Sequence, residues 1–152
     1  MRVLGIDPGT SCGWAVLDKG AHVASGVWDL KPRRHEGGGM RYLRLERYLV
    51  DSLAGVRAVF LEEVRRHAGT SAAHVYGGIL ATVQRVCEVR SIPYASIPVG
   101  TIKKAATGRG NAPKTAMIAA ARERWPTVEI EDDNHADALW IAHVGGKQWL
   151  DG

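Results

Sequence analysis

The sequence has little cysteine and no long apolar run. Its two cysteines, Cys12 and Cys87, stand alone, without a CxxC pair or a Cys/His cluster. We therefore expect reduced thiols and neither a disulfide framework nor a zinc site. No segment approaches the roughly 20 apolar residues of a membrane-spanning helix, and the N-terminus begins in a strand pattern without the regions of a signal peptide. These absences predict a cytoplasmic protein with no membrane partner.

Internal repeats and low-complexity tracts are absent as well. With 152 residues and 45% hydrophobic content, the chain can bury one core but is too short for two. We expect a single domain over residues 1–152. Lysine and arginine outnumber aspartate and glutamate by 20 to 16, which favours a polyanionic partner without requiring one.

The first 30 residues predict an antiparallel meander of three strands. The apolar run at residues 3–6 ends in Asp-Pro-Gly and predicts a short buried strand. The turn after it sends the chain back through a second strand at residues 13–17, and residues 21–30 alternate enough for a third. Asp7 therefore lies where the first strand ends. Its carboxylate either caps its own turn or faces a cation.

A second apolar strand pattern, residues 58–61, also ends in carboxylates, those of Glu62 and Glu63. Neighbouring strands lie about 4.8 Å apart, so Glu62 and Asp7 can share a cation if the two strands are adjacent. Side chains alternate along a strand, so Glu62 and Glu63 point to opposite faces and only one is a ligand. The alternative is a solvent-facing acid pair that closes an edge strand.

The patterns that follow predict a mobile, solvated basic loop at 32–39, helices at 40–53 and 69–90, and a strand at 91–99. Thr70 or Ser71 is the expected N-cap of the second helix. The pair Gly77 and Gly78 in its middle is unfavourable locally, but it permits close approach by another backbone. We expect a helix contact there, within the chain or between subunits.

Residues 101–114, TIKKAATGRGNAPK, form the most basic segment. Pro113 at a first helical position, with free N–H groups beside lysines, suits a phosphate site. The alternative is a solvated charged turn. The Walker A spacing is missing, so we expect no nucleotide cofactor.

The C-terminal segment supplies further acids. Asp133 is expected to cap a helix, and Asp133 and Asp137 are then i,i+4 neighbours on one face, with Asn134 and Asp137 three residues apart. The helix dipole explains acids at the start of a helix but not Asp137, which lies deeper beside apolar residues. A buried acid there indicates a metal. Acids bordered by basic segments are typical of a metal-dependent enzyme that acts on phosphodiesters.

Four segments, in order, resemble the RuvC-type Holliday-junction resolvases of the RNase H-like superfamily, particularly their shorter phage and bacterial relatives. These segments are LGIDPGTSCGWAV, FLEEV, GTIKKAATGRGNAPK and DDNHADALWIA. The first motif also opens actin-like kinases, which require a second domain. The resemblance implies an α/β RNase H-like fold, with a mixed central sheet of about five strands, three antiparallel and two parallel, flanked by helices.

The same resemblance implies a homodimeric endonuclease that cuts four-way DNA junctions symmetrically with two divalent ions, Mg²⁺ or, as a substitute, Mn²⁺. It assigns the ions to acids matching Asp7, Glu62 and Asp137, and it places Lys103 and Lys114 near the scissile phosphate. Lys114 is the lysine that we expect to act in catalysis. Further DNA contacts are expected from the basic flanks, at Lys103, Lys104, Arg109, Lys114, Arg65 and Arg66.

The sequence departs from this family at two points. A fourth ligand usually stands three residues before the last acid as Asp or His, and here that position is Asn134. Asp133 or His135 must take the role, and we favour Asp133 because carboxylate suits magnesium better than imidazole. The basic residues 65–67 stand where the family often has an aromatic wedge, so no cleavage preference is predicted.

Two other functional classes fit part of the pattern. An RNase H-like nuclease that acts on RNA, for example in rRNA maturation, would share the acids without requiring a dimer. A non-catalytic nucleic-acid-binding module would need basic flanks but has no need for buried acids on three separate elements.

Overall fold

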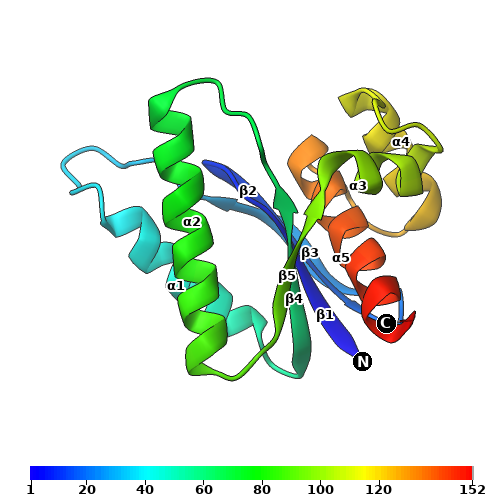
Figure 1. Cartoon of the computed structure of the whole chain (residues 1–152), viewed down its shortest axis with the longest axis horizontal. Coiled ribbons are helices and arrows are strands. Elements are labelled where there is room, and N and C mark those ends of the chain that lie inside the picture. Colours follow the sequence, from blue (N-terminus) through cyan, green and yellow to red (C-terminus); the bar gives the residue numbers. More distant parts are fainter. Residues whose placement is uncertain (152) are drawn as a thin grey trace.

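The computed structural model describes residues 1–151 and is organised around a mixed five-stranded sheet (Figure 1). The strands are β1 (Arg2–Asp7), β2 (Ser11–Asp18), β3 (Ala21–Asp29), β4 (Val56–Glu63) and β5 (Tyr94–Pro98). Their order across the sheet is β3-β2-β1-β4-β5. Strands β1 to β3 pair antiparallel, whereas β4 pairs parallel with β1 and with β5. The predicted meander and the mixed sheet are confirmed.

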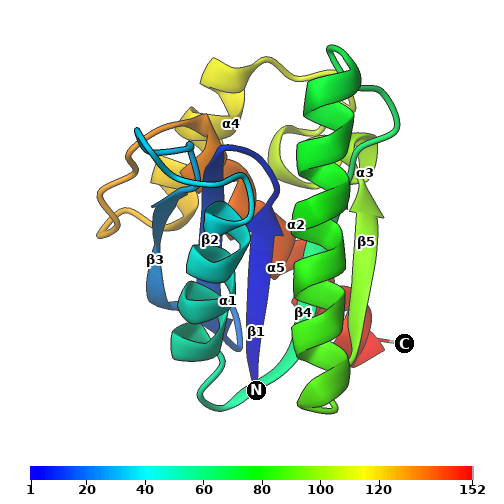
Figure 2. The same ribbon diagram turned by 90° about the vertical axis from the view of Figure 1, so that its left-hand side faces the viewer.

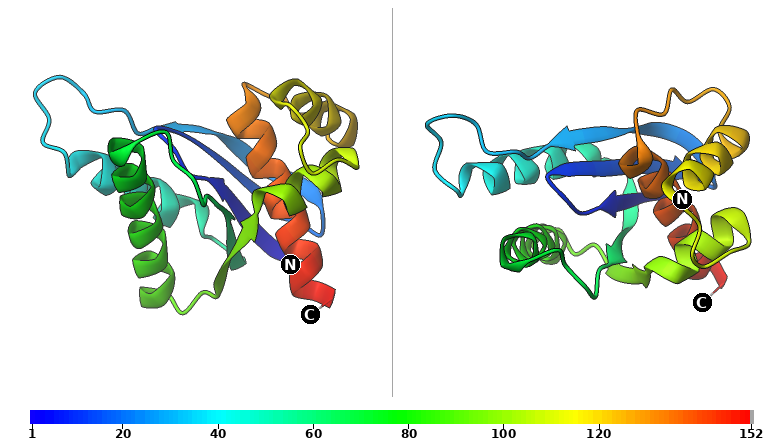
Figure 3. Two further views of the ribbon diagram at one scale, coloured as in Figure 1. Left: turned by 45° about the horizontal axis from the view of Figure 1, so that its top comes forward. Right: turned by 90° about the horizontal axis from the view of Figure 1, so that it is seen from above.

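Helices cover both faces of this sheet. They are α1 (Met40–Ser52), α2 (Thr70–Val89), α3 (Val99–Thr107), α4 (Lys114–Arg124) and α5 (Asp133–Asp151). Figure 2 shows α1 and α2 in front of the sheet and α5 behind it. Figure 3, seen from above, shows the same division, with α3 and α4 on the side of α5.

The two faces of the sheet belong to two apolar clusters, because side chains alternate along each strand. Leu4 and Ile6 of β1 face the cluster under α1 and α2. Val3 of β1 and Phe60 of β4 face the cluster under α5. Burial on both faces explains why β1 and β4 read as continuous apolar runs rather than alternating ones.

Helix α5 approaches the sheet at backbone distance, because two glycines leave room for it. A Cβ placed on Gly5 would lie 2.5 Å from the carbonyl oxygen of Ala138, and one on Gly13 would meet the carbonyl oxygen of Asn134 at 1.9 Å. Neither position can therefore carry a larger residue without moving the helix. This close contact brings the first turns of α5 to the end of β1 where Asp7 lies.

A glycine also sets the contact between α1 and α2. An added Cβ at Gly78 would lie 2.4 Å from the ring of Tyr42, while Gly77 faces open space. The expected helix contact at the glycine pair therefore exists within the chain, at Gly78.

Three local predictions were wrong. Residues 99–107 form α3, with Ile102 buried, where a charged turn was one of the expectations. Helix α4 begins at Lys114, so Pro113 precedes the helix instead of starting it. In α2, neither Thr70 nor Ser71 is the N-cap, since Gly69 occupies that position without a side-chain hydrogen bond.

Other expectations are met. Cys12 and Cys87 are buried, free thiols, and Arg33, Arg34 and His35 are exposed on the loop before α1. Among the described residues, no helix is both long and apolar enough to cross a membrane.

Candidate metal centre

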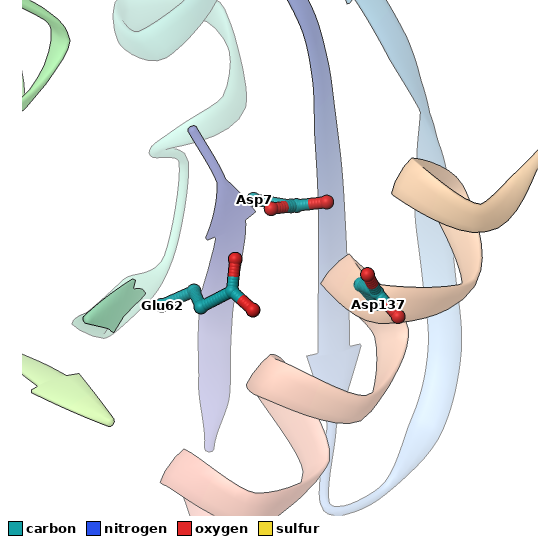
Figure 4. A group of neighbouring side chains, drawn as sticks. All are labelled: Asp7, Glu62 and Asp137. Carbon is teal, nitrogen blue, oxygen red and sulfur yellow. The ribbon is translucent and has the colours of Figure 1, made fainter. Parts of the chain in front are cut away.

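Asp7 and Glu62 meet because β1 and β4 run parallel and in register. Ile6 pairs with Leu61, so the next residues along the two strands are Asp7 and Glu62. Both side chains follow the alternation that points Val3 and Phe60 toward α5. Asp137 comes from the facing side, one turn into α5 (Figure 4).

The three carboxylates form one compact group. One oxygen from each of Asp7, Glu62 and Asp137 lies within 4.8 Å of the others, and Figure 4 shows the three side chains converging from two strands and a helix. Within the described part of the chain, Asp137 Oδ1 is buried without a hydrogen-bond partner. A buried oxygen of this kind is costly unless it binds a donor or a cation.

Burial and the neighbouring carboxylates raise the pKa values of Asp7 and Asp137. Asp7 is only 6% exposed, and its pKa lies well above the ordinary value because of burial first and then the charges of Glu62 and Asp137. The pKa of Asp137 is raised to about 7 by burial, Glu62 and Asp133, against the opposing charges of Lys103 and Lys114. The protein holds negative charge here that only a cation compensates fully.

Carboxylate oxygens are the ligands that Mg²⁺ prefers. The group therefore fits a hard divalent cation by its donor chemistry, by its unpartnered buried oxygen and by its excess negative charge. Glu63 takes no part, since it points away from the group and its carboxylate lies 2.9 Å from the guanidinium of Arg65. The expected placement of Glu62 and Glu63 on opposite faces of β4 is confirmed.

Asp133 lies close to the three acids without being one of the group. Its charge raises the pKa of both Asp7 and Asp137, and its Oδ2 is 3.7 Å from Nζ of Lys114. Its side chain is 25% exposed. Asp133 is therefore a partly exposed neighbour of the three acids.

Both ring nitrogens of His135 make hydrogen bonds to residues outside the acidic group. Nδ1 accepts the backbone N–H of Glu131 at 3.0 Å, and Nε2 lies 2.7 Å from Oγ of Ser25 on β3. The ring is 2% exposed. With both nitrogens engaged, this imidazole has no free position for a metal ion.

Sequence reasoning misplaced the cap of α5. The side chain of Asp132, not that of Asp133, accepts the backbone N–H of His135 at 2.9 Å, which is the bond that an N-cap residue makes. Asp133 is the first residue of the helix. Because Asp132 carries the capping role, the carboxylate of Asp133 is free to face Lys114 and the three acids.

The basic residues divide into two sets. Lys103 on α3 and Lys114 on α4 act electrostatically on Asp137, so they lie beside the acids as expected. Arg65 is bonded to Glu63, away from the group. Lys104, Arg66 and Arg109 are exposed, and the structure records no contact of theirs with the acids.

Sequence reasoning did not single out Arg41. This residue is 9% exposed and lines a cavity of about 440 Å³ between the turn after Asp7 and the start of α2, together with Thr10, His67 and Tyr76. One signal was available: Arg41 lies on the same helical stripe as the buried Leu45 and Leu49. A buried arginine on an apolar stripe is the feature that sequence reasoning passed over.

The chain is similar in sequence to RuvC proteins, although no model of a protein family matches it. It is 32% identical over 165 residues to the crossover junction endodeoxyribonuclease RuvC of Synechococcus sp. (strain CC9311), covering 97% of this chain and 99% of the relative. It is 30% identical over 155 residues to the corresponding protein of Anaeromyxobacter sp. (strain Fw109-5), covering 97% and 74%.

Solved structures show the same architecture. Thermus thermophilus RuvC in complex with Holliday junction substrate superposes with a TM-score of 0.81 at 28% identity, over 93% of this chain and 90% of the other. A second structure of Thermus thermophilus RuvC superposes with a TM-score of 0.79 at 26% identity, and the match covers 99% of this chain and 97% of the other. The expected RNase H-like fold is confirmed.

Proposed function

We propose that the group formed by Asp7, Glu62 and Asp137 is the active site of this chain. The chain belongs to the RuvC family of crossover junction endodeoxyribonucleases and is a junction-resolving endonuclease. The observation that carries this assignment is the convergence of three acids from β1, β4 and α5. One of their oxygens, Oδ1 of Asp137, is buried without a hydrogen-bond partner among the described residues. A module that only binds DNA gains nothing from such a group, which lowers stability when no cation is bound.

The family is metal-dependent, and we propose Mg²⁺ as the metal, with two ions per site and Mn²⁺ as a substitute. Asp7, Glu62 and Asp137 would hold them, with Asp133 as the fourth ligand. His135 is the weaker candidate because both of its ring nitrogens are engaged. Divalent ions bound in such a site would neutralise the carboxylates and would lower the pKa of water, which supplies a nucleophile at neutral pH.

The residues of the chain then position the phosphodiester for direct hydrolysis by water. Water attacks phosphorus in line, the bond from phosphorus to the 3′ oxygen breaks, and no covalent enzyme intermediate is needed. Lys114, with Lys103 beside it, contributes positive charge where negative charge develops on the phosphate oxygens. Glycines at positions 5 and 13 hold α5 against the sheet, and so fix Asp137 relative to Asp7.

Branched DNA is the substrate and partner. We propose that its backbone is held by the basic residues around the acids, with Arg41 added to those expected from the sequence: Lys103, Lys104, Arg109, Lys114, Arg65 and Arg66. A homodimer would present two such sites, so that two strands of one junction are cut symmetrically. We further propose that residues 1–152 act as one nuclease domain in the cytoplasm.

The experiment that tests this function is incubation of the protein with an end-labelled four-way junction and Mg²⁺. We expect paired nicks at symmetric positions in opposite strands, and no cutting of a linear duplex of the same sequence. Asp7→Asn is the matched inactive control. Preferential cutting of a structured RNA, or nicks that persist at full rate in Asp7→Asn, would contradict the proposal.

A further inference from the structure

A second concave site lies at the opposite end of β1 from Asp7. It is a cavity of about 230 Å³ whose floor is apolar, formed by Val3 of β1, Leu17 of β2, and Ala142 and Leu150 of α5. Figures 1 and 2 show the start of the chain and the last turns of α5 together at this end of the molecule. From Val3 to Asp7 the strand covers about 13 Å, so the cavity is separate from the acids.

The rim of this cavity is basic. Lys19 from the turn between β2 and β3, Arg124 from the end of α4 and Lys147 from α5 all line it, and no acidic residue does so among those whose side chains the structure describes. The acid next in sequence, Asp18, already accepts the N-terminal ammonium group of Met1 at 2.8 Å. Three cations therefore surround an apolar floor, and the described lining residues supply no counter-charge.

Aromatic residues next to the cavity fix the position of one of its lining cations. The Arg124 guanidinium lies over the ring of Trp125, 5.3 Å from its centre. The indole N–H of Trp125 donates to the carbonyl oxygen of Gly20 at 3.2 Å, and the ring packs edge-on against His143. Packing of this kind orders Arg124 before any ligand arrives, which lowers the entropy cost of binding.

His143 reports the sign of the local potential. Its ring lines the cavity between the rings of Trp125 and Trp140. Burial lowers the pKa of His143, and the charges of Arg124 and Lys147 lower it further. The imidazole therefore adds no charge of its own at neutral pH, and the three lining cations make the cavity favourable for a negatively charged ligand.

We propose that this cavity binds an acidic peptide segment of a partner protein, with one large apolar side chain on the floor and neighbouring carboxylates on Lys19, Arg124 and Lys147. The size supports this class of ligand, since pockets for whole small molecules span roughly 300 to 1,000 Å³ and this one is smaller. The apolar floor suits a side chain better than a phosphate backbone. Because the acids lie at the other end of β1, the partner can bind while DNA occupies the metal centre.

The test is direct binding of a labelled synthetic peptide with a central phenylalanine between pairs of aspartates, followed by fluorescence anisotropy. We expect saturable binding that weakens when alanine replaces the phenylalanine and when asparagines replace the aspartates. The double variant Arg124→Glu/Lys147→Glu should lose about tenfold or more in affinity, since it converts two attractive pairs into repulsive ones. Both side chains are exposed, and an unchanged circular dichroism spectrum checks the fold.

Arg122→Glu is the matched control, because Arg122 is an exposed cation of the same helix outside the cavity lining. Its peptide affinity should match that of the wild type. The proposal is overturned if the peptide does not bind saturably, or if Arg122→Glu loses as much affinity as the double variant. It is also overturned if the double variant loses affinity for a four-way junction as strongly as for the peptide, since the cavity would then contact DNA. Junction nicking is scored separately, so failure of the nuclease proposal would be recognised independently.

Discussion

The two ends of β1 carry opposite charges, and neither end is balanced by its own surroundings. At the Asp7 end, three carboxylates meet with one buried oxygen unpartnered among the described residues. At the Met1 end, three cations border an apolar cavity, and no acid lines it within the described part of the chain. Accumulating one sign of charge lowers the stability of the folded chain. The comparison supports our two proposals, in which each end binds a ligand of the opposite sign: metal ions at one and an acidic segment at the other.

The largest effect should follow from neutralising an acid of the metal centre. Asp7→Asn, Glu62→Gln and Asp137→Asn each remove a charged ligand, and each should lower the rate of junction nicking by more than about a thousandfold. Junction binding, measured by gel shift without metal, should be retained, because the basic flanks are intact. Glu63→Gln is the control and should keep the wild-type rate, since Glu63 is bonded to Arg65. Full activity in any of the first three variants removes that residue from the site.

The stability of the metal-free protein should fall as pH rises. Asp137 has its pKa raised from 3.8 to about 7, so between these values the folded state holds a proton that the unfolded chain releases. The free energy of unfolding therefore decreases from about pH 4 to about pH 7, by at most on the order of 4 kcal/mol for this group. Denaturant titrations in a chelator measure this slope. Asp137→Asn should flatten it, and an equally steep slope in that variant would contradict the account.

A smaller loss of activity should separate the candidates for the fourth ligand. Asp133→Asn should slow Mg²⁺-dependent nicking by roughly ten- to a hundredfold, since only one ligand of one ion is weakened. Asn134→Ala should be milder. His135→Ala should mainly lower stability, by about 1 to 2 kcal/mol, because it removes the bonds to Glu131 and Ser25. Burial lowers the pKa of His135, so a collapse of nicking in folded His135→Ala, with a wild-type rate that titrates below the ordinary imidazole pKa, would transfer the role to the histidine.

The smallest effect on nicking is expected at the other end of β1. Arg124→Glu/Lys147→Glu should cleave a four-way junction within about twofold of the wild-type rate, because screening by salt suppresses interactions between exposed charges beyond about 10 Å. A single-turnover assay at physiological salt measures this. A loss as large as that of Asp133→Asn would mean that the two ends are not independent.

Asp7 and Glu62 were predictable because they end two apolar strand runs, and strand alternation places Glu62 and Glu63 on opposite faces. Asp137 was predictable because it lies beside apolar residues, deeper in its helix than the helix dipole explains. The meander followed from the turn after Asp7. Helix α3 was harder, since a short helix with lysines, a glycine and little buried surface reads like a charged turn. The cap of α5 was ambiguous because consecutive acids, Asp132 and Asp133, both suit the position.

Other features depend on tertiary contacts that no local pattern reports. The position of α5 depends on Gly5 and Gly13, whose role becomes visible only when the helix lies against the sheet. The basic cavity joins Val3 to Lys147, at opposite ends of the chain. Individually these residues look like an ordinary core valine and a solvated lysine, so sequence reasoning had no reason to connect them.

Calorimetric titration of Mn²⁺ into the DNA-free protein tests the central claim most directly, which is that Asp7, Glu62 and Asp137 hold the metal ions. Wild type and Glu63→Gln should bind Mn²⁺ with the same affinity, and Asp7→Asn should lose at least about tenfold. Asp7→Asn should fold normally, since removing one of three repelling carboxylates relieves the metal-free site. Mn²⁺ affinity unchanged in Asp7→Asn would contradict the account, because the acids would then not be the metal centre.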